Sequence, residues 1–131
     1  MQFAIVISSP AQSAAMRRAL EFTRAVLAAG HSVNRVFFYQ DAVLQASSLQ
    51  VVAQDENNLT QQWQNLIQEY QLDAVVCIAA ALRRGLVDAA EAQRYGLPAS
   101  NLLPGFVLSG LGQLHEAIQE GERVVHFRGQ A

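Results

Sequence analysis

The chain contains a single cysteine, Cys77, and its sequence surroundings are those of a candidate reactive thiol. Residues 73–78 form a short, mainly apolar run that is typical of a buried strand, and Arg83 and Arg84 follow within two helical turns. Parallel α/β proteins present their chemistry at the carboxyl ends of strands, and nearby cations favour a thiolate over a thiol. A helix starting after the strand would add the positive end of its dipole. We therefore take Cys77 as the first candidate nucleophile.

The same residues also have purely structural interpretations. Free cysteine is among the most often buried residues and fits a strand as a small hydrophobe. Arg83 and Arg84 could be a solvated pair or could form an ion pair with Asp88, and successive helical residues cannot both point at one sulfur. From these residues alone, a reactive Cys77 and a packing Cys77 are both open.

Other polar motifs are weaker candidates. His31, His115 and His126 are far apart and form no i, i+4 pair with one another, so no metal site is predicted. Residues 109–112, Ser-Gly-Leu-Gly, resemble half of a phosphate loop but lack the third glycine and the acid, so we expect them to cap a helix. The Ser-Ser-Pro turn at 8–10 could hold an anion or be only a turn. There is no Gly-x-Ser-x-Gly nucleophile elbow.

Composition and charge exclude several function classes. The 131 residues are one domain's worth, so we expect residues 1–131 to form a single domain. Nine arginines and eleven acidic residues give a formal net charge of −2 without any basic tract, so direct nucleic-acid binding is not expected. Lysine is absent, which excludes lysine Schiff-base chemistry and a Walker A phosphate loop.

Hydropathy gives expectations about location and assembly. No apolar run approaches the ~20 residues of a membrane span, and the amino terminus lacks a signal-peptide pattern, so no membrane contact and a cytoplasmic location are expected. Hydrophobic residues make up 51% of the chain, more than a solvated monomer needs, which indicates a surface that meets another subunit. A lone cysteine cannot form an internal disulfide.

The apolar pattern predicts strands alternating with helices. Expected strands are 3–7, 33–39, 74–79 and 124–127, with 105–109 as a fifth candidate; expected helices run from Ser13 to Gly30 and over 59–70, 80–84, 89–94 and 111–119. Residues 40–54 are irregular and predict a long loop with little regular structure. Alternating elements with right-handed crossovers predict a single-domain, three-layer α/β/α sandwich of flavodoxin- or Rossmann-like shape, with a mainly parallel sheet of four or five strands.

Several segments together resemble the DsrE family of sulfur-relay proteins. The main match is residues 77–88, Cys-Ile-Ala-Ala-Ala-Leu-Arg-Arg-Gly-Leu-Val-Asp, followed by matches at 91–92, 96–97, 100–102 and 105–112. The opening strand residues 3–6 and the strand residues 36–39 match as well. The resemblance therefore runs over nearly the whole chain, which is far more specific than any one motif.

This resemblance implies a fold, a reaction and partners. A DsrE-like subunit would assemble with TusB- and TusC-like subunits into a cytoplasmic heterohexamer. The family's sulfur-accepting cysteine matches Cys77, which would take a persulfide sulfur from a TusA-like donor and pass it to a TusE-like acceptor for 2-thiolation of the tRNA wobble uridine. No cofactor is expected. The family also contains DsrE itself, which traffics sulfur with DsrF and DsrH in sulfur-oxidising bacteria.

Three functional hypotheses follow. The first is a persulfide-carrying sulfurtransferase that uses Cys77, with Arg83 or Arg84 assisting the thiolate or the docking of a partner. The second is a non-catalytic subunit that scaffolds an oligomer and uses Cys77 only for packing. The third is a small nucleotide- or flavin-binding domain of flavodoxin-like shape.

Overall fold

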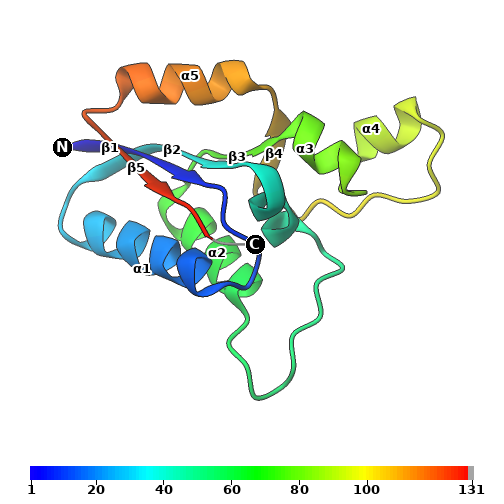
Figure 1. Cartoon of the computed structure of the whole chain (residues 1–131), viewed down its shortest axis with the longest axis horizontal. Helices are drawn as coiled ribbons and strands as arrows, with labels where there is room; N and C mark the ends of the chain where they lie inside the picture. The colour runs from blue at the N-terminus through cyan, green and yellow to red at the C-terminus, as the bar shows by residue number, and fades with distance from the viewer. Residues whose placement is uncertain (130–131) are drawn as a thin grey trace.

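Five parallel strands form one sheet at the centre of the protein (Figure 1). The computed structural model describes residues 1–129. The strand order is β4-β3-β2-β1-β5, so the chain starts near the middle of the sheet and adds strands first on one side and then on the other. The strands are β1 (Gln2–Ile7), β2 (Ser32–Phe38), β3 (Ala74–Cys77), β4 (Phe106–Ser109) and β5 (Arg123–Phe127).

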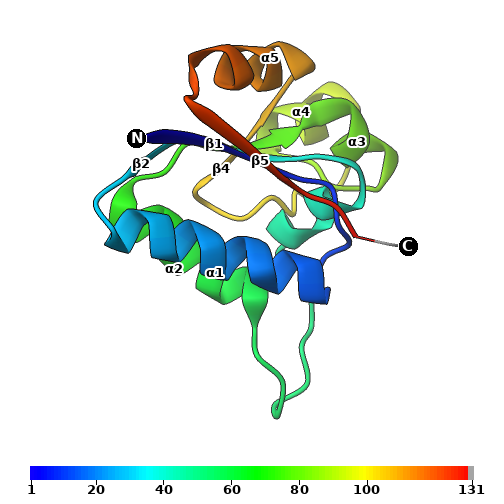
Figure 2. The ribbon, with the colours of Figure 1, turned by 60° about the vertical axis from the view of Figure 1, so that its left-hand side comes forward.

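Helices cover both faces of this sheet. In Figures 1 and 2, α1 (Ala14–Ala28) and α2 (Leu59–Tyr70) lie side by side on one face, and α5 (Leu111–Glu120) lies alone on the other. The short helices η1 (Gln40–Ala46), α3 (Ile78–Arg83) and α4 (Ala89–Arg94) lie beyond the carboxyl ends of β2 and β3. The predicted three-layer sandwich is confirmed, with all five strands parallel.

Local signals set the ends of the helices. The Ser13 hydroxyl accepts a hydrogen bond from the amide of Met16 at the start of α1, and Gly30 follows that helix with a φ of +89°. The Asp88 carboxylate accepts one from the amide of Glu91, so α4 begins at Ala89 as predicted.

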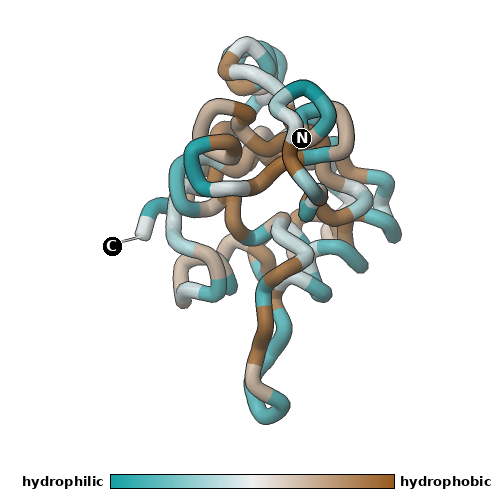
Figure 3. The backbone as a smooth tube through the Cα atoms, turned by 90° about the vertical axis from the view of Figure 1, so that its right-hand side faces the viewer, coloured by the Kyte–Doolittle hydropathy of each residue, from teal (hydrophilic) through white to brown (hydrophobic). Residues whose placement is uncertain are grey.

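The core fills the layer between the sheet and helices α1 and α2. The ring of Phe38 packs edge-on against Trp63 of α2 and against Phe106 of β4. All three side chains are buried, and the hydrophobic segments in Figure 3 concentrate along the strands and the helix faces toward them. Burial of this kind is the main favourable term in folding.

A partly buried arginine ties α5 to its face of the sheet. Arg35 of β2 forms an ion pair of 2.7 Å with Asp73 and donates a hydrogen bond of 2.9 Å to the carbonyl of Gln113 in α5. Burial lowers the pKa of the guanidinium, but the hydrogen bonds and charges of Asp73 and Glu116 outweigh it, so the pKa of Arg35 is raised. The positive charge of Arg35 is thus paired with the carboxylates of Asp73 and Glu116.

Residues 40–54 were predicted to be a loop, and this is wrong for the first half. Residues 40–46 form the 3₁₀ helix η1, which buries Ala42, Val43 and Ala46. Gln45 is also fully buried. Its side-chain carbonyl accepts a hydrogen bond from the backbone amide of Gln12, and its side-chain amide donates one to the hydroxyl of Thr60 in α2. A 3₁₀ helix has three residues per turn and lacks the 3.6-residue pattern used for prediction. Residues 47–58 do form a loop, which projects from the body in Figures 1 and 2.

Candidate functional site

Cys77 lies at the junction between β3 and α3. The sequence predicted a strand to residue 79, but β3 ends at Cys77 and α3 begins at the next residue. Pairing with β4 also ends here, with Cys77 opposite Ser109, and the alanines that follow are strong helix formers. Cys77 is therefore both the last strand residue and the N-cap of α3, without an intervening loop.

The alternation of side chains along β3 indicates which face of the sheet Cys77 occupies. Val76 pairs with Phe38, whose ring packs against Trp63 on the α2 side. Neighbouring strand residues point to opposite faces, so Cys77 lies on the α5 side. On the β4 side, Ser109 is the register partner of Cys77.

The Cys77 side chain is covered. Only 2% of the residue is exposed, and it belongs to the continuous hydrophobic core. Its thiol makes no capping hydrogen bond to the first turn of α3. Reaction with another protein's thiol therefore requires the segments around Cys77 to move.

The two predicted arginines occupy different places. Arg84 forms an ion pair with Asp41 of η1, at 3.0 Å between Nε and Oδ1, and its Nη1 donates a hydrogen bond of 2.9 Å to the carbonyl of Ala80. Arg83 is exposed at the last turn of α3. Within residues 1–129, neither arginine forms a hydrogen bond or ion pair with Cys77. The assistance predicted from them stays a prediction.

Sequence reasoning missed Asp41 as a partner of Arg84. The expected alternative was Asp88, which lies four residues from Arg84 but forms no ion pair with either arginine in the described part of the chain. Asp88 caps α4 instead. Asp41 is separated from Arg84 by 43 residues, and it lay in the stretch predicted as a loop, so no local signal pointed to it.

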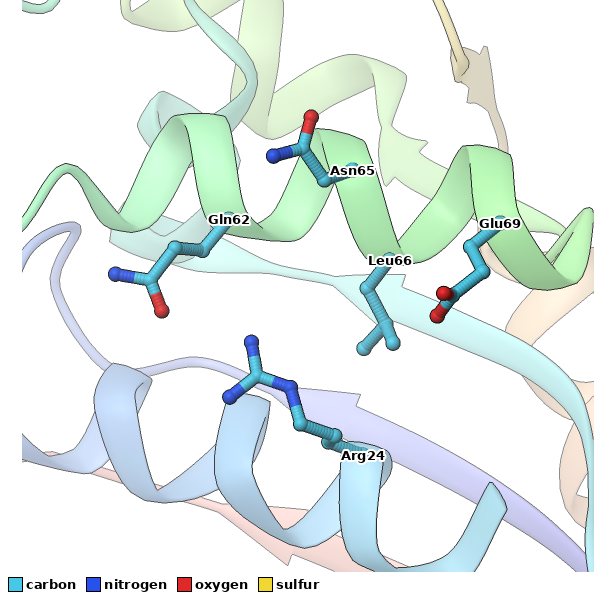
Figure 4. A pocket seen from close by; sticks show the side chains of 5 residues that line it. All are labelled: Arg24, Gln62, Asn65, Leu66 and Glu69. Carbon is cyan, nitrogen blue, oxygen red and sulfur yellow. The ribbon is translucent and has the colours of Figure 1, made fainter. Parts of the chain in front are cut away.

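Surface hollows occur on both sides of the sheet. A mainly apolar groove of about 460 Å³ runs along the end of α3 and the segment after α4, with Leu82, Val87 and Leu97 in its walls. A smaller hollow of about 140 Å³ lies between α1 and α2, on the other side of the sheet from Cys77. Figure 4 shows the Arg24 side chain reaching from α1 across this hollow toward α2. Only the first of them adjoins the helix that begins after Cys77.

The weaker sequence candidates have structural roles. Gly110 is the N-cap of α5, as expected for residues 109–112. The Ser8 hydroxyl lies 2.8 Å from Nε2 of His126, which joins the ends of β1 and β5. Partial burial, and then the charge of Arg128, lower the pKa of His126, which favours the neutral ring. No cluster of three metal-binding side chains occurs among residues 1–129, and no helix in this range is long and apolar enough to cross a membrane.

Comparison with known proteins identifies the family of this chain. The sequence model of the DsrE/DsrF-like family matches residues 1–127. The chain belongs to the DsrE/DsrF-like family. The relationship predicted from the sequence is confirmed over nearly the full length.

Several relatives of this DsrE/DsrF-like protein carry sulfurtransferase names. A sulfurtransferase TusD homolog of Pseudomonas aeruginosa is 55% identical, and the match covers 98% of each chain. The sulfurtransferase TusD of Serratia proteamaculans is 44% identical over 97% of this chain and 99% of its own. A protein of Allochromatium vinosum, provisionally named sulfurtransferase DsrE, is 45% identical over 97% and 98% of the two chains. These names support a sulfur-transfer role in a sulfur-relay system.

A solved structure gives independent support for the DsrE/DsrF-like fold. The crystal structure of the ychN protein from E. coli superposes with a TM-score of 0.74 and covers 97% of this chain and 100% of its own. Only 18% of the aligned residues are identical, so this likeness concerns the fold alone.

Proposed function

We propose that this protein is a sulfurtransferase subunit that carries sulfur as a persulfide on Cys77. The observation that carries the proposal is the place of the chain's one cysteine: it ends a central strand at the edge where α/β proteins present their chemistry. The sulfurtransferase names of relatives that match nearly the whole chain support the same reaction class.

The proposed reaction consists of two sulfur transfers with no net oxidation. The Cys77 thiolate attacks the outer sulfur of a donor persulfide; a new S–S bond forms at Cys77, the donor's S–S bond breaks, and the donor leaves as a thiolate. In the second step, an acceptor thiolate attacks the outer sulfur on Cys77 and takes it, which returns Cys77 to the thiolate. Only one sulfur atom moves.

The absence of a second cysteine suits a carrier. A neighbouring thiol could attack the inner sulfur of the Cys77 persulfide, close a disulfide and release the cargo as hydrosulfide. The chain has no other cysteine, so this loss within the subunit cannot occur. The cargo leaves through a partner's thiol or an added reductant.

The proposal extends to partners and pathway. The donor is a TusA-like protein, the acceptor is a TusE-like protein, and the subunit works in the cytoplasm in a heterohexamer with TusB- and TusC-like subunits. The transferred sulfur serves 2-thiolation of the tRNA wobble uridine. The TusD names of the relatives at 55% and 44% identity support this pathway.

A second pathway is supported by one specific relative. The Allochromatium vinosum protein with a DsrE name is 45% identical, close to the identity of the Serratia TusD. A DsrE-type subunit of a sulfur-oxidation complex would use the same Cys77 chemistry with different partners. The proteins that co-purify with the tagged chain distinguish the two pathways.

Replacing Cys77 by serine separates a carrier from a scaffold. In cells that lack the natural gene, we expect the Cys77→Ser protein to co-purify with its partner subunits while tRNA 2-thiolation is lost. Normal thiolation with this variant would contradict the carrier proposal and support a scaffold. If Cys77→Ser loses its partner subunits and Cys77→Ala keeps them, the assembly defect comes from the buried hydroxyl, and the expected loss of thiolation in Cys77→Ala then tests the carrier proposal.

A further inference from the structure

We propose that Asp41 is a positioning residue for sulfur exchange: through Arg84 it holds α3 against η1 and so limits the access of other thiols to Cys77. A role in sulfur exchange rests on the proposed function. The contacts between η1 and α3 do not depend on it.

Cys77 is joined directly to α3. Cys77 is the N-cap of α3, and only 2% of it is exposed. Because no loop separates the cysteine from the helix, the first turn of α3 cannot move without changing the surroundings of the thiol. A thiol attacking a persulfide must approach the outer sulfur along the S–S bond, so a covered sulfur does not react.

Arg84 connects the end of α3 to η1. Its guanidinium bridges two elements: Nη1 donates to the carbonyl of Ala80 within α3, and Nε pairs with the carboxylate of Asp41 on η1. The first contact fixes the arginine on its own helix, and the second fixes that helix to η1. Asp41 is the acidic residue in the first turn of η1, where a carboxylate also has favourable interactions with the amide groups.

The η1 side of this connection is firmly anchored. The amide of Tyr39, just before η1, donates a hydrogen bond of 2.8 Å to the carbonyl of Ile7 in β1. Gln45 is fully buried, and its carbonyl accepts from the amide of Gln12 at 3.0 Å. The η1 helix therefore gives the end of α3 a firm support through the Asp41–Arg84 pair.

The ion pair is the contact most open to change. The Arg84 side chain is 29% exposed and that of Asp41 is 52% exposed, so salt or a partner's carboxylate can compete for the arginine. A docking protein that supplies such a carboxylate would loosen α3 and uncover Cys77. The sulfur would then be covered except when a partner is bound.

The test measures the rate at which iodoacetamide alkylates Cys77. This reaction uses the free thiol, so it needs no sulfur donor. We expect Asp41→Asn to raise the alkylation rate about two- to fivefold, the range that fits the loss of a partly exposed ion pair. The increase should appear in the plateau rate at high pH, which reports access, while the midpoint of the pH profile stays at the wild-type value. Added salt should speed the wild-type reaction and leave that of Asp41→Asn unchanged.

Control variants separate this role from a general loss of stability. Asp73→Asn removes the partner of Arg35 at the opposite end of β3 and should leave the alkylation rate unchanged. Asp41→Glu keeps the carboxylate that pairs with Arg84 and should keep the rate near that of the wild type. Low urea concentrations should not change the rates, as expected for local opening rather than global unfolding.

Two results would overturn the inference: an Asp41→Asn rate equal to the wild-type rate, or an equal rise in Asp73→Asn. The proposed function fails by a different result. If Cys77 takes up no sulfur but Asp41→Asn is alkylated faster, access is controlled as inferred and the carrier proposal is wrong.

Discussion

Cys77 must satisfy two opposing demands in a sulfur carrier. A persulfide exposed to the solvent loses its outer sulfur to any thiol or reductant, whereas a persulfide that is never exposed cannot be passed on. In this structure the thiol is 2% exposed, which meets the first demand. Its place next to a six-residue helix tied down by an exposed ion pair offers a way to meet the second.

The sequence predicted the position of Cys77 better than its surroundings. An apolar run ending in Cys77 was enough to place it at the carboxyl end of a strand, because that pattern depends on neighbouring residues. Its burial results from the packing of strands and helices that are far apart in the sequence, and local patterns do not report such packing. The sequence therefore predicted a candidate nucleophile on a buried strand and left open whether its thiol is reactive or only packed in the core.

His126 gives a pH-dependent prediction at the scale of one residue. Its pKa in the folded protein is lowered below the ordinary 6.5 by burial and by Arg128, so the unfolded chain binds the proton more readily. Folding stability from this group is therefore complete above about pH 6.5 and is lost as the pH falls below that value. We expect His126→Gln to lose less stability than the wild type between pH 7.5 and 5.5 in urea unfolding. Equal losses would contradict the prediction.

At the scale of elements, prediction worked where a helix carries its own end signals. The helix α4 was predicted with both ends correct, with Gly96 and Pro98 as the signals for its end; the structure adds Asp88, which caps its start. The helix η1 was missed because it is stabilised from outside. Its buried Gln45 looks like a loop residue in the sequence and finds its partners only at Gln12 and in α2.

The polar contacts of Gln45 predict the stability of the η1 region. The Thr60 hydroxyl accepts hydrogen bonds from the side-chain amides of Gln12 and Gln45, so Thr60→Val would leave both donors without this acceptor. We expect Thr60→Val to lower the free energy of unfolding by about 1–3 kcal/mol. Thr60→Ser keeps the hydroxyl and is expected to cost clearly less. Urea unfolding of the two variants measures the difference, and equal effects would argue against a role for the hydrogen bonds.

The whole molecule has an asymmetric cover of helices, which bears on assembly. Two helices pack on one face of the sheet, but α5 alone covers the other (Figure 2). Leu111 and Ile118 of α5 are seven residues apart, so they share one face of the helix, and both are about half exposed. Exposed apolar residues on one helix face are typical of a contact with another subunit, in agreement with the composition.

We expect the double variant Leu111→Ser with Ile118→Ser to keep the fold and lose co-purification with the proposed partner subunits. Serine removes apolar surface that is already exposed in the isolated chain, so the circular dichroism spectrum should not change. Tyr70→Ser, which changes an exposed residue at the end of α2, is the matched control and should keep the partners. Retained partners in the double variant would show that assembly uses another surface.

The central claim concerns the whole relay, and one measurement tests it most directly. The protein is incubated with a cysteine desulfurase, cysteine and a TusA-type donor, and the masses of the intact chain and of its Cys77 peptide are recorded before and after addition of an acceptor thiol. We predict a gain of one sulfur atom on the peptide that contains Cys77, none on Cys77→Ser, and its loss when the acceptor thiol is added. A wild-type chain that gains no sulfur while an established relay subunit is loaded in the same mixture would contradict the account.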